Sequence, residues 1–158
     1  MIRTPLALLA VAAALAACGG DDHDHDHGAD AGIDCSLIME GQDVYSPGLE
    51  KVGDAGYAVR LLMSDPAPPA RGDNTWTIEV VDASDAPVDG LEIDVDTWMP
   101  HHQHGSPIHA DDMPAGAPGQ YTLAPVNLFM PGIWEVTLHL MQNGSEVDSV
   151  VYTFCIDG

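Results

Sequence analysis

Four histidines lie close together between Trp98 and His109, in the segment WMPHHQHGSPIH. Besides Met99, the segment offers as candidate metal ligands His101, His102, His104 and His109. Imidazole nitrogen suits copper, zinc and nickel, whereas the soft thioether sulfur of methionine favours Cu(I). Side chains two residues apart in an extended chain point the same way. The segment therefore predicts a copper site, Cu(I) or Cu(II), with zinc or nickel as the other metals, and His102 and His104 are its preferred pair of ligands.

The other candidate ligands each have a simpler interpretation. His101 points away from its neighbours unless the loop turns, and His109 lies farther along the same loop. Met99, at the end of a strand, fits the core as well as it fits a metal site. Met130, in the sequence FMPG, either caps the core or reaches the site from a neighbouring loop. His139 lies on the polar face of a strand and is expected to be a solvated surface residue.

A second candidate for metal binding is the run DDHDHDH at residues 21–27, in which His23, His25 and His27 alternate with aspartates. Alternating imidazole and carboxylate groups bind Cu(II), Ni(II) or Zn(II) in many weak arrangements. The run has no apolar side chain to bury, so the sequence predicts a disordered tether over residues 18–34. A solvating spacer without a metal role is the alternative interpretation.

The N-terminal segment has the features of an export signal. Residues 1–17 contain the basic Arg3 and then an apolar run from Leu6 to Ala17, shorter than the roughly 20 apolar residues of a spanning helix. The run ends LAAC, which resembles the bacterial lipobox and predicts lipid attachment to Cys18 after cleavage; an ordinary secretory signal is the alternative. A lipid of more than one acyl chain anchors stably. Gly19, in the position that sorts such lipoproteins, favours the outer membrane, facing the periplasm.

Acidic residues dominate the composition. The chain has 25 Asp and Glu against four Lys and Arg, which gives a formal net charge of −21. Such a chain repels nucleic acid and anionic lipid faces, so no nucleic-acid partner is expected. The charge attracts cations, metal ions among them, although solubility alone accounts for most of it. The expected partners are the membrane, through the lipid, and a protein that donates or accepts copper.

The cysteine count agrees with export. With Cys18 lipidated, Cys35 and Cys155 remain, and two thiols in an oxidising compartment usually pair. A bridge between them would close a loop of 120 residues, worth about 4–5 kcal/mol in the chain-entropy model. A thiol-based metal site is the alternative, but both cysteines lie far from the histidine cluster in the sequence and there is no Cys-x-x-Cys.

Alternation of apolar and polar residues predicts short β-strands. The runs are Tyr57–Met63, Asn74–Val81, Leu91–Val95, Tyr121–Leu123, Trp134–Leu140 and Val150–Phe154. A period of two places one face of each strand in a core and the other in water, and Asn143-Gly144 is a strong hairpin signal. These features predict an all-β, antiparallel immunoglobulin-like β-sandwich of about seven short strands, folded as one domain over residues 35–158. Trp76 and Trp134 are expected in the core, on facing sheets.

From Gly72 to His139 the chain resembles the YtkA-like/FixH-like family of small exported or membrane-tethered β-sandwich domains. The resemblance is carried by GDNTW at 72–76, MPxHxHG at 99–105, GQY at 119–121 and FMPGxW at 129–134. The family is associated with copper handling and cytochrome oxidase biogenesis, which implies a copper chaperone or buffer linked to copper-enzyme assembly. The family element carries over to Met99, His102 and His104. FixH-like proteins are often held by a transmembrane helix, where this chain has a lipobox instead.

No catalytic arrangement is visible in the sequence. It contains no Gly-x-Ser-x-Gly and no nucleotide-binding glycine loop. Metal-assisted hydrolysis needs three ligands, an open position and a nearby base, and the adjacent Asp111 and Asp112 are expected to be solvated. The sequence therefore predicts a metal-binding protein that is not an enzyme. The alternative is a non-catalytic immunoglobulin-like interaction or structural module, in which the histidines are surface residues of a recognition loop.

Overall fold

The computed structural model of the protein describes Cys35 and residues 41–158. Its elements are the strands β1 (Leu49–Val52), β2 (Ala58–Asp65), β3 (Gly72–Val81), β4 (Glu92–Met99), β5 (His104–Gly105), β6 (Asp111–Pro114), β7 (Gln120–Leu128), β8 (Gly132–Gln142) and β9 (Ser145–Ile156). The predicted all-β class is confirmed. The predicted signal peptide, Cys18 and the histidines at 23, 25 and 27 lie outside the described residues. Within the described residues, no helix has the length and apolar character to cross a membrane.

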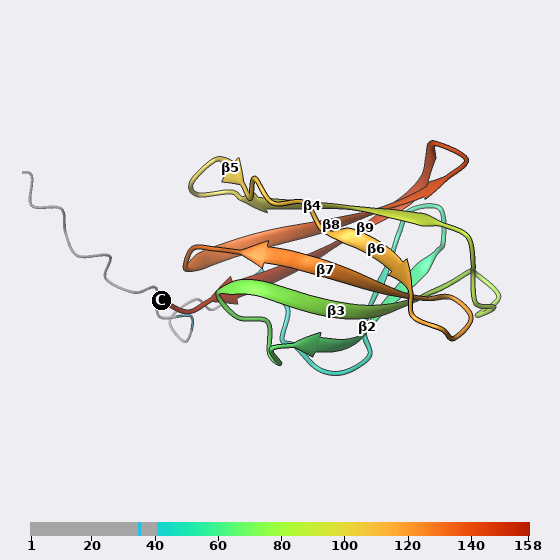
Figure 1. The fold of residues 1–158 in the computed structure, drawn as a ribbon, viewed down its shortest axis with the longest axis horizontal. Coiled ribbons are helices and arrows are strands. Elements are labelled where there is room, and N and C mark those ends of the chain that lie inside the picture. The colour runs from blue at the N-terminus through green and yellow to red at the C-terminus, as the bar shows by residue number, and fades with distance from the viewer. Residues whose placement is uncertain (1–34, 36–40) are drawn as a thin grey trace, which may run out of the picture.

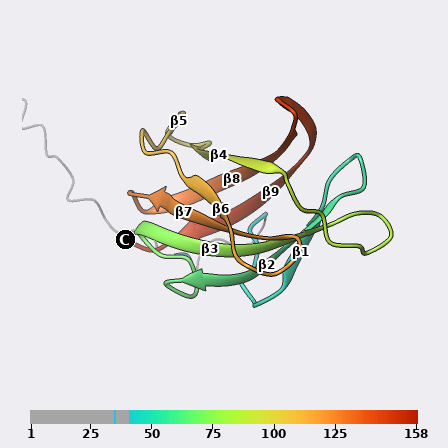
Figure 2. The same cartoon turned by 45° about the vertical axis from the view of Figure 1, so that its right-hand side comes forward.

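The strands form two antiparallel sheets (Figure 1). One sheet has the order β1-β2-β3-β7-β6 and the other β5-β4-β8-β9. Figure 2 shows the strands β4, β8 and β9 as one layer and β2, β3 and β7 as the other. The predicted sandwich is therefore confirmed.

The core lies between the sheets and follows from the alternation of side chains along each strand. Trp76 of β3 and Trp134 of β8 are both fully buried and come from opposite sheets, as predicted. Trp76 meets the rings of Tyr152 and Phe154 edge to face, with centroids 5.8 and 5.7 Å away. This is an arrangement that aromatic pairs prefer. Large aromatic side chains thus fill the space between the layers.

The structure contains three short strands that the sequence analysis did not predict. β1, β5 and β6 have only two to four residues, too few for an alternation to be recognised. The predicted run Tyr121–Leu123 was too short, because the strand there, β7, continues to Leu128. Pro125 has no N–H to donate to a neighbouring strand. The pairing of β7 with β3 accommodates it by a register shift between Asn74 and Trp76.

The longest strand, β9, forms one edge of its sheet. The Asn143-Gly144 turn joins it to β8 with φ angles of 51° and 74°, as the hairpin signal predicted. Near its end, Cys155 forms the predicted disulfide with Cys35. Asp43 covers the free edge: its N–H donates to the Thr153 carbonyl at 2.7 Å, and its carboxylate accepts from the Thr153 N–H at 2.8 Å.

At the end of the sandwich away from this disulfide, side-chain hydrogen bonds close the loops. We call residues 82–90 and 117–119 the turn end. The carboxylate of Asp82 accepts from the N–H groups of Ser84 and Ala86 at 2.8 and 3.0 Å. A short acidic side chain thereby replaces the backbone partners that a turn lacks.

Tyr121 joins the turn end to the core. Its hydroxyl donates to the carbonyl of Val88 at 2.8 Å and accepts from the N–H of Leu91 at 3.1 Å. Burial of the phenol raises the pKa of Tyr121, and the nearby charges of Asp89 and Asp112 raise it further. The ring is almost completely buried, so its two hydrogen bonds fix the loop before β4.

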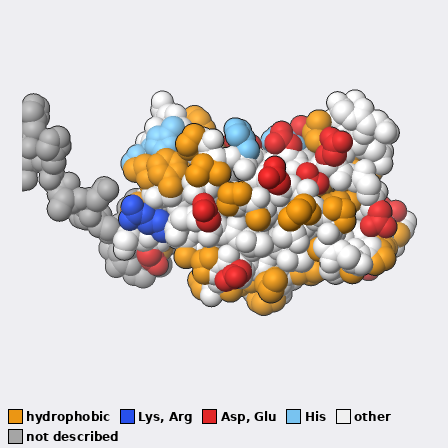
Figure 3. All heavy atoms as spheres, viewed as in Figure 1, with side chains coloured by type: hydrophobic (Ala, Val, Ile, Leu, Met, Phe, Trp, Pro, Cys, Tyr) orange, Lys and Arg blue, Asp and Glu red, His pale blue; other side chains and the backbone are white. Residues whose placement is uncertain are grey.

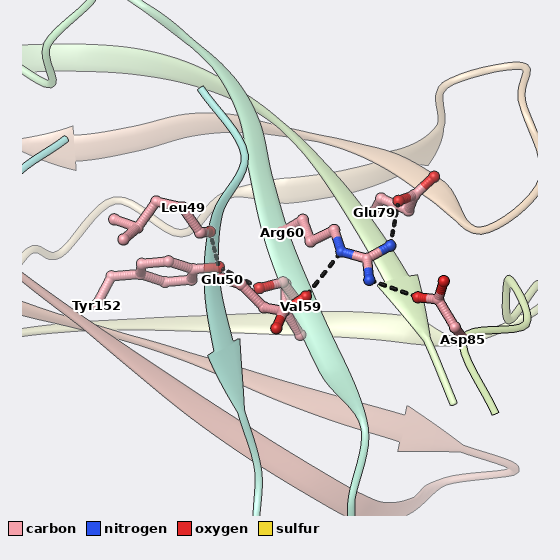
Figure 4. A network of polar contacts seen from close by, with 7 residues as sticks. All are labelled: Leu49, Glu50, Val59, Arg60, Glu79, Asp85 and Tyr152. Atoms are coloured by element: carbon pink, nitrogen blue, oxygen red, sulfur yellow. Dashed lines mark hydrogen bonds and ion pairs between the residues drawn. The ribbon is translucent and has the colours of Figure 1, made fainter. Parts of the chain in front are cut away.

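The outer face of the five-stranded sheet carries a charged cluster around Arg60 (Figure 4). The guanidinium donates to Asp85, to Glu50 at 2.8 Å and to Glu79 at 3.1 Å. These hydrogen bonds, with that to Asp85 the largest cause, raise the pKa of Arg60. Its acidic partners come from β1, from β3 and from the loop after β3, so the cluster links neighbouring strands on a solvent-facing surface.

Candidate metal site

The histidine segment folds as a tight hairpin between β4 and β5. Met99 at the end of β4 pairs with His104 of β5. The turn closes where the N–H groups of His102 and Gln103 donate to the carbonyl of Met99 at 3.1 and 2.8 Å. Gln103 adopts a left-handed conformation, with φ of 55°. The segment is therefore a turn, and not the extended run on which the pairing of His102 with His104 was predicted.

This turn nevertheless brings His102 and His104 together. Their ring centroids are 5.8 Å apart, with an interplanar angle of 65°. His102 is exposed and His104 is half-buried, so the pair lies at the surface. Met99 and His104 are opposite each other in the ladder, and opposite side chains share one face of a sheet. Two imidazoles and one thioether are thus gathered at one end of the sandwich.

An aromatic stack supports the ring of His104. It stacks on Phe129 with centroids 5.7 Å apart and planes 25° apart. Phe129 in turn meets Trp134 edge to face at 5.6 Å, and the indole N–H of Trp134 donates to the carbonyl of Met130 at 2.9 Å. Because Trp134 is fully buried, the stack runs from the core to the surface. It restricts the orientation of the His104 ring. We call residues 99–109 and 127–130 the histidine end.

Gly105 allows the hairpin to lie against β4. A Cβ atom at this position would stand 2.1 Å from the backbone oxygen of Thr97, far inside any tolerated contact. Close approach of two backbones therefore requires glycine here. The His-Gly pair was part of the quoted motif, but the reason for its glycine was not predicted.

A chain of hydrogen bonds ties the loop after β5 to the opposite sheet. The N–H of Ser106 donates to the hydroxyl of Thr97 at 3.2 Å, and the Ser106 hydroxyl donates to the side-chain oxygen of Asn127 at 2.8 Å. The amide of Asn127 then donates to Asp73 at 2.5 Å. These residues come from three different strands and one loop, so no spacing in the sequence indicated them.

The remaining sequence candidates are placed as follows. Met99 has no exposed surface and belongs to the hydrophobic core, whereas Met130 is partly buried and packs against that core. His101 and His109 are both exposed. His139 lies on the outer face of β8, where its Nδ1 is 2.9 Å from the carboxylate of Glu146. His139 thus lies on the polar face of its strand, as the sequence predicted.

The described residues at this end offer imidazole nitrogen and thioether sulfur as possible metal donors. Closed zinc sites take four nitrogen or sulfur ligands. Among Cys35 and residues 41–158, no group of three His, Cys, Asp or Glu side chains could hold a metal ion. Imidazole combined with thioether is instead a donor set that favours Cu(I). Figure 3 shows histidine side chains at the end of the molecule that carries β5, beside an apolar surface, and further histidine atoms along the same edge towards the middle of the molecule.

Comparison with known proteins adds one match. A family model described as YtkA-like matches residues 51–139, more than half of the chain. This range begins within β1 and ends within β8, so it includes the whole histidine end. No curated protein and no solved structure matches the chain.

Proposed function

This chain belongs to the YtkA-like family, and from that premise we propose that it binds copper as an exported, membrane-tethered protein. The observation that carries the proposal is the pair His102 and His104, whose rings are 5.8 Å apart at the exposed end of the sandwich. Copper is cargo in this proposal, and the protein serves as a chaperone or buffer linked to copper-enzyme assembly. A donor or acceptor protein exchanges the ion with it.

Each ligand has a stated role. His102 and His104 hold the ion through ring nitrogen, and Met99 supplies thioether sulfur. Met99 is the register partner of His104, and such partners have Cβ atoms about 4.5–5.5 Å apart. Met130 is the second thioether at this end, and its backbone is held by Trp134. A pair at the surface leaves the ion accessible to an acceptor protein.

The location of the protein follows from its N-terminal sequence. Cys18 carries the lipid and holds the protein at the outer membrane, facing the periplasm. The Cys35–Cys155 disulfide suits an oxidising compartment. The strongly acidic composition disfavours nucleic acid as a partner. Binding and transfer of an ion need no catalytic residues, so the proposed protein is not an enzyme.

A titration with Cu(I) tests the proposal. The mature chain carries Cys18→Ser, to remove the lipid, and serine at positions 23, 25 and 27, to remove the N-terminal histidines. Under anaerobic conditions with ascorbate, which spares the disulfide, it should bind one Cu(I) in competition with a chromogenic chelator. His102→Ala with His104→Ala should weaken binding by more than about 100-fold, beyond the 10–100-fold of outer-shell changes.

Two controls make the titration specific. His101→Ala with His109→Ala removes two exposed imidazoles from the same loop and should leave the affinity unchanged. All variants should unfold within about 0.5 kcal/mol of the parent, as surface substitutions usually do. A parent chain that binds neither Cu(I) nor Cu(II) in this titration overturns the proposal.

One observation favours a second function, a non-catalytic interaction module. Trp98 and Ile108 beside the histidine hairpin are 41% and 46% exposed. Exposed aromatic and aliphatic side chains are common in protein interfaces. If the parent chain binds no metal, this surface becomes the leading candidate for function.

A further inference from the structure

Trp98 leaves a large aromatic side chain exposed beside the histidine hairpin. The residue is 41% exposed and lies on the outer face of β4, since its neighbours Thr97 and Met99 are buried. In the ladder between β4 and β5, Trp98 pairs with Gly105, next to the pair of Met99 with His104. Gly105 has no side chain to cover the indole. An exposed apolar ring therefore adjoins the strand that carries His104.

The rest of this face of β4 is acidic. The outward-facing residues before Trp98 are Glu92, Asp94 and Asp96, and all three are exposed. We call them the acidic row. From the rise of a strand, successive members of the row are about 7 Å apart. Glu135 of β8 lies opposite Trp98 and shares its face of the sheet. Four carboxylates thus surround the approach to the exposed indole.

The four-stranded sheet supplies no positive charge to balance these carboxylates. Its strands β4, β5, β8 and β9 contain no Lys or Arg. The ion pairs of the described residues involve Lys51, Arg60 and His139, and none includes a carboxylate of the acidic row. Figure 3 shows acidic side chains along the border of the molecule near β4 and β6, with no basic side chain among them. The outer face of this sheet therefore carries a negative potential.

A hollow of about 340 Å³ continues the negative face around the edge of the sandwich. Glu92 and Asp94 of β4 line it together with Asp111 and Asp112 of β6, which is the edge strand of the other sheet. Carboxylates from both sheets thus face one open space. Lysine and arginine side chains are the groups that form charge-assisted hydrogen bonds with carboxylates.

The charge of this face selects the class of partner that fits it. A second copy of this chain, a nucleic acid or an anionic lipid surface would bring negative charge against negative charge, which interfaces avoid. An exposed tryptophan is typical of contacts between proteins, where aromatic side chains are enriched. A protein with lysine and arginine around an apolar patch matches both the acidic row and Trp98.

We propose that the outer face of β4, from Glu92 to Trp98, is the docking surface for a basic protein that exchanges copper with the histidine end. The proposal rests on the copper-binding function proposed above and names the chemistry of the donor or acceptor. The acidic row attracts and orients the partner, and Trp98 makes the contact nearest the ion. Complementary charge raises the rate of association more than it raises affinity, and most of all at low salt.

A docking measurement without copper tests the surface itself. The probe is a synthetic peptide in which the copper-binding sequence Met-x-x-Met-x-x-Met has three lysines at each end, and the control peptide has glutamates in their place. The metal-free mature chain with Cys18→Ser is isotope-labelled, titrated with each peptide and followed by NMR. The lysine peptide should shift the amide signals of β4 and the indole signal of Trp98 most strongly, and the glutamate peptide should shift neither. Shifts spread evenly over acidic residues of both sheets would overturn the proposal.

Matched substitutions separate the acidic row from the total charge. Asp94→Asn with Asp96→Asn removes two carboxylates from the row, whereas Asp54→Asn with Asp65→Asn removes two exposed carboxylates from the turn before β2 and from its end. With the chain loaded with Cu(I), transfer to the lysine peptide should slow about 10-fold in the first variant and less than about 2-fold in the second. Equal losses in the two variants would show that only net charge matters.

Trp98→Ala tests the apolar part of the surface. It should weaken docking of the lysine peptide several-fold at low and at high salt, because salt screens charges and leaves an apolar contact in place. A loss confined to low salt would contradict the role of the indole.

The outcomes also separate this inference from the proposed function. If the chain binds Cu(I) but the lysine peptide leaves the signals of β4 unchanged, the docking surface is overturned while the copper site stands. If the peptide docks on β4 but the chain binds no Cu(I), the copper function is wrong, and the exchange of copper at this surface falls with it.

Discussion

The two ends of the sandwich use their polar residues differently. At the turn end, Asp82 accepts two backbone N–H groups and Tyr121 bonds to Val88 and Leu91. At the histidine end, buried Asn127 closes a similar chain of hydrogen bonds with Ser106. There, however, the imidazole of His102 is exposed and that of His104 is half-buried.

The difference indicates that one end of the domain is built for stability and the other carries the groups of the candidate site. Hydrogen bonds to the backbone are worth about 0.5–1.5 kcal/mol each and fix the loops of the turn end. At the histidine end the same kind of bond fixes the loop after β5, and the imidazoles of His102 and His104 are the groups that the proposed function assigns to a ligand. Substitutions at the turn end should therefore change stability, whereas substitutions among the histidines should change binding.

The largest expected effect comes from the disulfide that anchors the histidine end. Cys35→Ser with Cys155→Ser should lower the free energy of unfolding by about 4–5 kcal/mol, because the bridge closes a loop of 120 positions. Equilibrium denaturation in urea measures this loss. The native chain treated with a reductant is the matched control and should show the same loss. A change below about 1 kcal/mol would mean that the covalent link contributes little to this end.

Two glycines give a direct comparison of the ends. Gly119→Ala at the turn end forces φ of +70° on an alanine and brings its Cβ within 2.7 Å of the Val80 carbonyl oxygen. It should destabilise the fold by roughly 3 kcal/mol and leave copper affinity nearly unchanged. Gly105→Ala at the histidine end should displace only the two-residue strand β5. Its stability loss should be about 1–2 kcal/mol, with copper affinity reduced about 10–100-fold.

Thermal unfolding and the Cu(I) titration are applied to both glycine variants. They check that Gly119→Ala loses more stability and that Gly105→Ala loses more copper affinity. Gly144→Ala is a useful control, since it also has a positive φ of 74° but meets no atom within 4 Å. It isolates backbone strain from contact. Equal loss of copper binding in Gly105→Ala and Gly119→Ala would show that the two ends are not independent.

The smallest expected effect is the alkaline response of the turn end. Burial raises the pKa of Tyr121, so the folded protein keeps this proton to higher pH than the unfolded chain, where the pKa is about 10. Stability from this group is complete below pH 10 and is lost as pH rises above it. Tyr121→Phe should cost about 1–2 kcal/mol at neutral pH, through the unpaired N–H of Leu91.

The same variant should lose less stability than the parent between neutral pH and pH above 10. Urea denaturation at a series of pH values measures the difference. Burial also raises the pKa of Tyr152, so the variant retains the part of the alkaline decline that Tyr152 causes. Parallel curves for variant and parent would show that Tyr121 does not titrate differently in the two states.

The long strands were predictable from sequence because one face of each is buried. Trp134, Val136 and Leu138 alternate with polar residues, and this period of two is a local property of the chain. The short strand β5 was not predictable, because its pairing depends on the contact of Gly105 with β4. Likewise the predicted run Tyr121–Leu123 ended too early, because β7 continues past Pro125, where its pairing with β3 shifts register.

The candidate site was half predictable. His102 and His104 were chosen from their types and spacing, and the structure places their rings together. The reason given for the choice, an extended segment, does not hold, because Gln103 turns the chain. Asn127 and Phe129 support the hairpin from β7 and from the turn after it. Contacts between segments so far apart in the sequence depend on how the strands are arranged, so the sequence did not indicate them.

Asp43 has a consequence for how copies of this protein meet one another. A twelve-residue edge strand such as β9 presents unpaired N–H and carbonyl groups that invite strands from other molecules, the first step towards aggregation. Asp43 already occupies both groups of Thr153, and Asp148 accepts from the N–H of Ser149 at 2.9 Å. An incoming strand would have to displace an aspartate at two places along this edge. Asp43 and Asp148 thus protect part of this edge, which disfavours the pairing of one copy with another along β9.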